Sequence, residues 1–165
     1  MTKVFSVGAE AEILRDNNVI IKRRVKKEYR IPQIDTKLRL FRTKREAKIM
    51  TKLEPLINVP RIIEVNDFEI KMDFIEGIPL VEMIDDLKHK DREGLCMKIG
   101  ESIGIMHSND VIHGDLTTAN ILVRNNETYF IDFGLSFVSS KPEGKAVDLH
   151  LMWQSLNSRH HEHAE

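Results

Sequence analysis

The chain has 165 residues, of which 41% are hydrophobic and 31% charged, and its formal net charge is −1. A chain of this size buries about 70% of its unfolded surface, so we expect one domain or two small lobes around a cleft. No apolar run approaches the ~20 residues that cross a bilayer, and the single cysteine, Cys96, excludes an internal disulfide. We therefore expect a cytoplasmic protein that does not enter a membrane.

Three short strands are predicted at the N-terminus, over residues 3–7, 11–16 and 19–24. Asn17-Asn18 is a strong hairpin turn between the second and third strands. The turn Gly8-Ala9-Glu10-Ala11 precedes the second strand. Its glycine and small alanines allow the backbone to approach a phosphate, although a plain hairpin turn has the same composition.

The third strand ends in Val19-Ile20-Ile21-Lys22, which resembles the kinase strand whose lysine pairs with nucleotide phosphates. A lysine that ends an apolar strand is otherwise simply exposed. A helix is predicted over 35–53, and its Glu46 is placed to bind Lys22. The sequence Thr43-Lys44-Arg45-Glu46 also matches a capping box, in which case Thr43 begins a second helix and Glu46 is a structural cap.

Residues 22–48 hold twelve Lys or Arg and three acids, a net charge of +9, whereas the rest of the chain carries −10. Such an excess suits a polyanion or an acidic partner, and it equally suits a solvated helix face. We expect Lys22 to lie in the cleft. We expect the following residues to form an exposed positive face near a polyanion or an acidic partner: Arg23, Arg24, Lys26, Lys27, Arg30, Arg39 and Arg42.

Two further strands, over 59–65 and 68–72, lead into a hinge predicted at residues 73–77. The N-lobe is then residues 1–72 and the C-lobe is residues 78–165. Met72 would face an adenine at the hinge, or fill the core as Met commonly does.

Two helices are predicted in the second lobe. The helix Asp91–Ser108 delivers the chain to His113. The helix over 145–156 carries Asp148, which either binds the backbone of the loop at His113 or is a surface acid.

The segment His113-Gly114-Asp115-Leu116-Thr117-Thr118-Ala119-Asn120 is followed, twelve residues after Asn120, by Asp132-Phe133-Gly134. Protein kinases carry H-R-D-L-x-x-x-N and D-F-G, so Gly114 is the one mismatch. The apolar runs at 121–123 and 129–131, with Asn125-Asn126 between them, predict a hairpin with Asn120 and Asp132 at its open end.

Phosphoryl transfer needs positioning and charge neutralisation from the protein, and these residue types supply both. Asp115 would accept the proton of the attacking hydroxyl, and Asn120 and Asp132 would hold one or two Mg²⁺ ions. The alternative is an ordinary surface hairpin with unrelated carboxylates.

The sequence after Gly134 departs from ordinary kinases, since about ten residues separate it from the next helix and no A-P-E motif is present. There is no room for a peptide-binding activation segment, so we expect little activity on external peptides. The tail residues His160, His161 and His163 suggest a metal site only weakly, because adjacent histidines point apart on a helix.

Together these motifs resemble one small family, the atypical kinase subunit of the KEOPS (EKC) complex, also called PRPK, which is related to the RIO kinases. The resemblance implies an α+β, minimal two-lobed protein-kinase-like fold. It has a small β-rich N-lobe with one or two helices, a mainly helical C-lobe and no full activation segment. The motifs that carry the resemblance are Gly8–Ala11, Arg42–Ala47, His113–Asn120, Asp132–Phe137 and Lys145–Leu149.

The resemblance also implies ATP and Mg²⁺ as cofactors, autophosphorylation on Ser or Thr, and ATPase activity in a complex that adds threonylcarbamoyl to a tRNA adenosine. The implied partners are the threonylcarbamoyl transferase subunit and a small accessory subunit. The family usually continues past the His-Ala-Glu ending with a basic tail that this sequence does not include.

Carried over by position, Asp115 is the catalytic proton acceptor, Lys22 binds phosphates, Glu46 orients Lys22, and Asn120 and Asp132 bind metal. The implied nucleotide-binding residues are Val7, Gly8, Ala9, Glu10, Ala11, Ile13, Ile20, Lys22, Met72, Asp73, Phe74, Ile75, Leu122 and Ile131.

Two other functions stay open, a pseudokinase-like scaffold and a small-molecule phosphotransferase. The complete set of Lys22, Asp115, Asn120 and Asp132 argues against the scaffold. The missing acceptor-binding insertion argues against the small-molecule enzyme.

Overall fold

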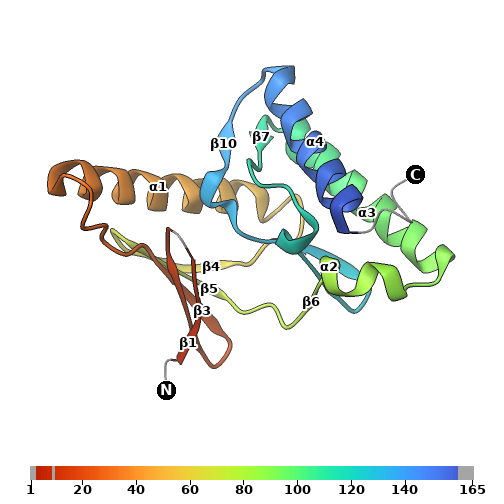
Figure 1. Cartoon of the computed structure of the whole chain (residues 1–165), viewed down its shortest axis with the longest axis horizontal. Coiled ribbons are helices and arrows are strands. Elements are labelled where there is room, and N and C mark those ends of the chain that lie inside the picture. The colour runs from red at the N-terminus through yellow and green to blue at the C-terminus, as the bar shows by residue number, and fades with distance from the viewer. Residues whose placement is uncertain (1–2, 9, 160–165) are drawn as a thin grey trace.

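The computed structural model describes residues 3–8 and 10–159, which form a β-rich part and a mainly helical part (Figure 1). The β-rich part is a five-stranded antiparallel sheet in the order β1-β2-β3-β5-β4, with the long helix α1 beside β4 and β5. Its elements are β1 (Lys3–Val7), β2 (Glu12–Asp16), β3 (Val19–Arg23), α1 (Pro32–Leu53), β4 (Ile62–Val65) and β5 (Glu69–Asp73).

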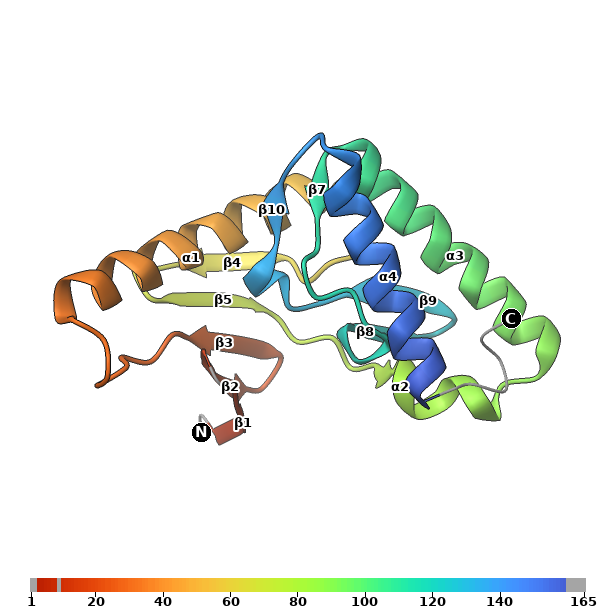
Figure 2. The ribbon, with the colours of Figure 1, turned by 45° about the horizontal axis from the view of Figure 1, so that its top comes forward.

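The helical part contains two long helices, α3 and α4, and two small sheets (Figure 2). Strands β6, β8 and β9 form one sheet, and β7 pairs with β10 in the other. The elements are β6 (Ile78–Pro79), α2 (Leu80–Met83), η1 (Ile84–Asp86), α3 (His89–Ser108), β7 (Val111–Ile112), η2 (Thr118–Asn120), β8 (Ile121–Arg124), β9 (Glu127–Phe130), η3 (Phe133–Leu135), β10 (Phe137–Val138) and α4 (Pro142–Arg159). Among the described residues, no helix is long and apolar enough to span a membrane.

The predicted two-lobed α+β fold is confirmed, and so is a helix over 35–53, but the alternative that Thr43 begins a second helix is wrong. The helix α1 is continuous and begins at Pro32, a residue favoured at the first helical position because it has no N–H to leave unpaired. Thr43 lies inside it, buried, and its hydroxyl donates to the carbonyl of Arg39 at 2.9 Å. The capping-box interpretation of Thr43 and Glu46 is therefore wrong as well.

Element ends shift by a few residues from the predicted ones. The strand predicted from residue 59 begins at Ile62, and Val59 and Pro60, which are buried, precede it outside the strand. The last helix begins at Pro142 rather than at 145, so only residues 136–141 lie between η3 and α4.

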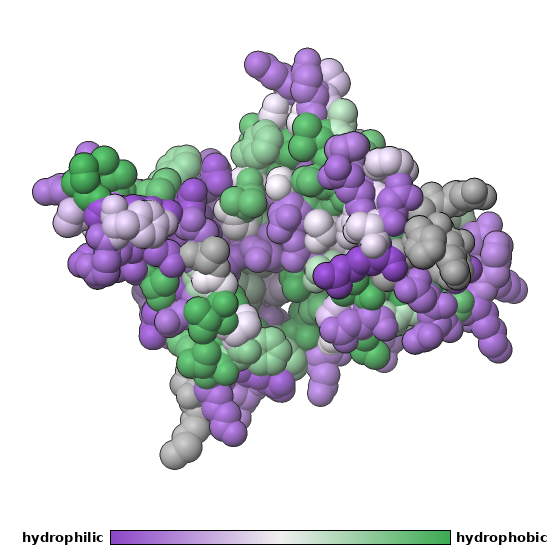
Figure 3. Space-filling view, viewed as in Figure 1, coloured by the Kyte–Doolittle hydropathy of each residue, from purple (hydrophilic) through white to green (hydrophobic). Residues whose placement is uncertain are grey.

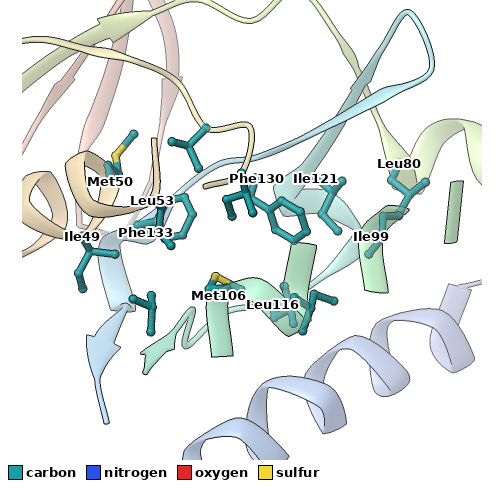
Figure 4. Packing of buried hydrophobic residues seen from close by; sticks show 14 of the residues in the cluster. Ile49, Met50, Leu53, Leu80, Ile99, Met106, Leu116, Ile121, Phe130 and Phe133 are labelled. Atoms are coloured by element: carbon teal, nitrogen blue, oxygen red, sulfur yellow. The ribbon is translucent and has the colours of Figure 1, made fainter. Parts of the chain in front are cut away.

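One buried apolar cluster runs through both parts of the molecule (Figure 4). Met50 and Leu53 from α1 reach it from the β-rich side, and Met106 from α3 and Phe130 from β9 reach it from the helical side. Phe133, which has no exposed surface, lies in the turn that packs against α1. Because the two parts share a core, the geometry between them is fixed by packing rather than by the connecting chain alone.

Candidate nucleotide and phosphoryl-transfer site

A cleft of about 510 Å³ lies between the sheet and the helical part, where the space-filling view is hollowed (Figure 3). Ile20 and Met72 line it from the sheet, and Leu122 and Ile131 line it from the helical part. Apolar walls with a few convergent polar groups are typical of small-molecule sites. The polar groups here come from Lys22, Glu46, Asn120 and Asp132.

Lys22 lies between two carboxylates. Its Nζ donates to Oε1 of Glu46 and to Oδ1 of Asp132, each at 2.6 Å. Burial alone lowers the pKa of Lys22, but the charges of Glu46 and Asp132 outweigh it and raise the pKa above its ordinary value. Lys22 is therefore a fully charged ammonium at the end of the cleft.

Asp132 adopts a left-handed backbone conformation, with φ of 60°, that non-glycine residues seldom take. Its Oδ1 accepts a hydrogen bond from the Gly134 N–H at 3.2 Å, which closes the turn. Burial works to raise the pKa of Asp132, yet the pKa lies below its ordinary value because Lys22 stabilises the charged form. About half of this side chain is exposed, so the carboxylate faces the open cleft.

The hairpin of β8 and β9 places Asn120 beside Asp132, as the sequence predicts. Asn125 and Asn126 both have positive φ, which is the conformation of a tight type I′ turn. At the open end, the Ile131 N–H donates to the carbonyl of Asn120 at 3.0 Å. The Asn120 Nδ2 donates to the backbone carbonyl of Asp115 at 2.8 Å and to its Oδ2 at 2.9 Å, so the Asp115 carboxylate is held by a residue that lines the cleft.

Asp148 of α4 is fully buried and binds the backbone of the loop that contains Asp115. Its carboxylate accepts the N–H of His113 at 2.7 Å and the N–H of Gly114 at 2.8 Å. The Nε2 of His107, at the end of α3, lies 3.1 Å from the same carboxylate. Of the two sequence interpretations of Asp148, the structure shows the one that ties down the loop.

His113 is buried and neutral. Its Nδ1 accepts the Asp115 N–H at 3.3 Å, so Nε2 carries the proton and donates to the carbonyl of Ile131 at 3.1 Å. Burial lowers the pKa of His113 below its ordinary value. The ring also packs on Phe133, with 4.7 Å between centroids, which connects the catalytic loop to the turn at Asp132.

Gly114, the one mismatch to the kinase motif, has a structural reason. Its φ is +79°, and a Cβ at this position would lie 2.6 Å from the carbonyl oxygen of Leu135. The backbone at Gly114 and the backbone at Leu135 are therefore too close for any side chain at position 114, unless the backbone moves.

Nine of the predicted nucleotide-binding residues line the cleft, namely Ile13, Ile20, Lys22, Met72, Asp73, Phe74, Ile75, Leu122 and Ile131. Val7, Gly8, Glu10 and Ala11 do not line it. Ala9, together with His160, His161 and His163, lies outside the described residues. The lining residues that the sequence reasoning missed are Phe5, Ser6, Met50, Pro60, Gly77, Pro79, Glu82 and Ala119. Met50 had a usable signal, since it lies one helical turn after Glu46.

The prediction of an exposed positive face over residues 22–48 is wrong for Arg24, which is 4% exposed and donates to Glu46. Arg39 pairs with Asp35 at 2.7 Å. Arg30 and Arg42 both bind Glu10, at 3.1 and 2.6 Å. Glu10 lies outside segment 22–48, so its pairs with Arg30 and Arg42 offset part of the segment's charge excess. Arg23, which pairs with Glu69, and Lys26 are the exposed members of the predicted face.

The fold and this site define a protein of the protein-kinase-like class. The chain matches the model of the RIO domain over residues 3–148, and it belongs to the RIO family. Within this family it is similar to Bud32 proteins, which confirms the resemblance seen in the sequence.

The chain is 40% identical to the KEOPS complex subunit Bud32 of Pyrococcus abyssi, over 96% of this chain and 78% of that protein. It is 44% identical to the EKC/KEOPS complex subunit BUD32 of Enterocytozoon bieneusi, over 94% of this chain and 82% of that protein. A probable bifunctional tRNA threonylcarbamoyladenosine biosynthesis protein of Methanosarcina acetivorans is 36% identical over 94% of this chain, which matches only 28% of that longer protein.

Solved structures support the fold. The Rio2 kinase of Chaetomium thermophilum in an ADP/Mg²⁺-phosphoaspartate complex has a TM-score of 0.77 at 18% identity, over 96% of this chain and 55% of that one. The ADP-bound aminoglycoside phosphotransferase APH(2'')-Ib has a TM-score of 0.70 at 15% identity, over 99% and 78%. At these identities the likeness shows the fold alone.

Proposed function

We propose that this chain is an ATP- and Mg²⁺-dependent atypical kinase and ATPase that acts as the Bud32-type subunit of a KEOPS complex. The observation that carries the proposal is the position of Lys22, 2.6 Å from both Glu46 and Asp132, in a cleft that Asn120 also lines. Removing the charges of Lys22, Glu46 and Asp132 from water costs free energy, and a protein that served only as a scaffold would not need to bear this cost.

The residues fit a magnesium-bound nucleotide. Mg²⁺ is commonly bound through one or two protein ligands together with phosphate oxygens. Asp132 presents a half-exposed carboxylate, and Asn120 uses only its Nδ2 toward Asp115, which leaves its Oδ1 available. When bound, Mg²⁺ supplies charge neutralisation on the transferred phosphoryl group.

In this proposal the chain's residues have distinct tasks. The apolar slot between Ile20 and Leu122 takes the adenine, with the segment at residues 73–77 beside it. Lys22 binds phosphate oxygens, and Glu46 fixes the position of Lys22. Asp115 accepts the proton of an attacking hydroxyl or water as the phosphoryl group moves.

The proposed acceptors are Ser or Thr hydroxyls of the chain itself or of a docked partner. Residues 135–141 are occupied by the end of η3, the strand β10, which pairs with β7, and a short connection to α4. This leaves no peptide platform next to Asp115. With radiolabelled ATP and casein, label is expected on the chain and not on casein, whereas efficient casein labelling would contradict this part of the proposal.

ATP turnover tests the catalytic assignment. Asp115→Asn keeps the shape of the side chain but removes the proton acceptor, so turnover is expected to fall by ~10²–10⁴-fold. Asp91→Asn, at an exposed position at the start of α3, is the matched control and is expected to leave turnover unchanged. Wild-type turnover in Asp115→Asn would remove Asp115 from the mechanism.

The role in tRNA modification is supported by the relatives, and it includes contact with a threonylcarbamoyl transferase subunit and a small accessory subunit in the cytoplasm. It also includes tRNA proximity at the exposed part of segment 22–48. Replacing Bud32 with this chain in a reconstituted Pyrococcus abyssi KEOPS complex is expected to sustain threonylcarbamoyladenosine formation on tRNA. Assembly without product, while wild-type ATP turnover persists, would contradict the role and leave the kinase assignment intact.

A further inference from the structure

Arg24 is a second buried cation beside the catalytic lysine. Alternate residues of a strand point to the same side, so Lys22 and Arg24 share a direction while Arg23 points away to Glu69. The Arg24 N–H donates to the carbonyl of Phe68 at 2.8 Å, which continues the sheet one residue beyond the end of β3. With its side chain 4% exposed, Arg24 is enclosed by protein.

Glu46 is divided between the two cations. Its Oε1 accepts from Lys22 and its Oε2 accepts from the Nη2 of Arg24, both at 2.6 Å. Lys22 and Glu46 line the nucleotide cleft, whereas Arg24 does not. Arg24 therefore contacts Glu46 from behind, where a nucleotide cannot compete for it.

Arg24 also reaches the turn that presents Asp132. A Cβ placed on Gly134 would lie 3.4 Å from the Nη2 of Arg24 and 3.3 Å from the Nζ of Lys22. One guanidinium thus connects the end of β3, the middle of α1 and the turn of η3. These are the three elements whose relative position sets the catalytic geometry.

We propose that Arg24 is a positioning residue that keeps Glu46 turned toward the cleft while Lys22 exchanges Asp132 for nucleotide phosphates. The inference rests on the proposed function. Without Arg24, Lys22 alone must neutralise the buried Glu46. Lys22 is then less free to bind the phosphates, and the Oε2 of Glu46 has lost its hydrogen-bond donor. With Arg24, Glu46 keeps one fixed cation throughout, so α1 stays in its active position without help from a longer segment after Gly134.

Arg24→Met tests the proposal, with Arg124→Met as the matched control, because Arg124 is exposed at the end of β8 and does not line the cleft. Since small displacements of catalytic groups cost up to ~10²-fold, kcat for ATP turnover is expected to fall by roughly 10- to 100-fold in Arg24→Met, with a smaller change in KM for ATP. Arg124→Met is expected to retain wild-type kcat. Arg24→Lys, which keeps the charge, is expected to recover most of the loss.

A double-mutant cycle separates positioning from mere structural support. If Arg24 acts through Glu46, Arg24→Met lowers kcat little further in a Glu46→Gln background, whereas independent effects multiply. Multiplying effects, or equal kcat in Arg24→Met and wild type, would overturn the inference. Should Arg24→Met unfold at the assay temperature, Arg24→Lys and Arg24→Gln replace it, and equal activity of the two would overturn the inference. An inactive wild type would instead contradict the proposed function itself.

Discussion

The backbone conformation at position 114 explains why this chain has glycine where the kinase motif has arginine. Gly114→Ala forces a side chain into a left-handed conformation, which costs about 1–2 kcal/mol before the contact with the Leu135 carbonyl is counted. We expect a loss of at least this size in the free energy of unfolding, measured with urea. Gly100→Ala is the control, because no atom lies within 4 Å of its added Cβ on α3. It is expected to stabilise the protein by about 0.5–1 kcal/mol, and equal effects of the two changes would contradict the account.

His113 makes a prediction about pH. Its pKa is lowered in the folded protein, so protons bind preferentially to the unfolded chain. The free energy of unfolding is therefore expected to fall as pH drops below about 6.5, the ordinary pKa of histidine. His113→Gln is expected to show a shallower fall between pH 7 and 5, whereas the exposed control His89→Gln keeps the wild-type slope. Equal slopes in the two variants would show that His113 does not carry the effect.

Site residues can be predicted from the sequence when both the residue type and the spacing are those that a known reaction requires. Asp115, Asn120 and Asp132 are brought together because a hairpin of fixed length must return the chain to its start. Arg24 is misplaced because counting charges treats every arginine as a surface residue. The alternation of Lys22 and Arg24 on one strand was the available signal, and Glu46 as a shared partner depends on how α1 packs.

At the scale of elements, α4 holds the loop at residues 113–115 through a single carboxylate. Asp148→Ala leaves the buried N–H of His113 and the part-buried N–H of Gly114 without their acceptor. An unpaired buried donor costs roughly 1–3 kcal/mol and a part-buried one less, so urea unfolding is expected to show a loss of at least about 1–3 kcal/mol. Gln154→Ala, an exposed change on the same helix, is expected to stay within about 0.5 kcal/mol of wild type. A similar small change in Asp148→Ala would show that the loop is held by other contacts.

The elements themselves are predicted well where periodicity is strong and less well at their ends. The strands β1 to β3 and the hairpin of β8 and β9 follow from alternation and Asn-rich turns. For α1 the sequence left open a second helix from Thr43, because a Thr-x-x-Glu pattern has the same letters inside a helix as at its start. Only the tertiary environment distinguishes them, since here Thr43 is buried and Glu46 faces the cleft.

At the scale of the whole molecule, the β-rich and helical parts share one core. The cleft between them is lined by Lys22, Asn120 and Asp132. The two-lobed fold follows from the order of motifs along the sequence. The surface charge does not, because Glu10, which lies outside segment 22–48, pairs with Arg30 and Arg42, and the buried Glu46 pairs with Arg24, 22 residues away. The net charge of segment 22–48 therefore overstates the positive surface available to RNA.

The central claim is that this cleft binds a nucleotide through magnesium at Asn120 and Asp132. Titration calorimetry with a non-hydrolysable ATP analogue, with and without Mg²⁺, tests it directly. We predict binding that strengthens with Mg²⁺ in the wild type and in Asp91→Asn, and binding in Asp132→Asn that no longer responds to Mg²⁺. Absence of binding to the wild type, or an unchanged response to Mg²⁺ in Asp132→Asn, would contradict the account.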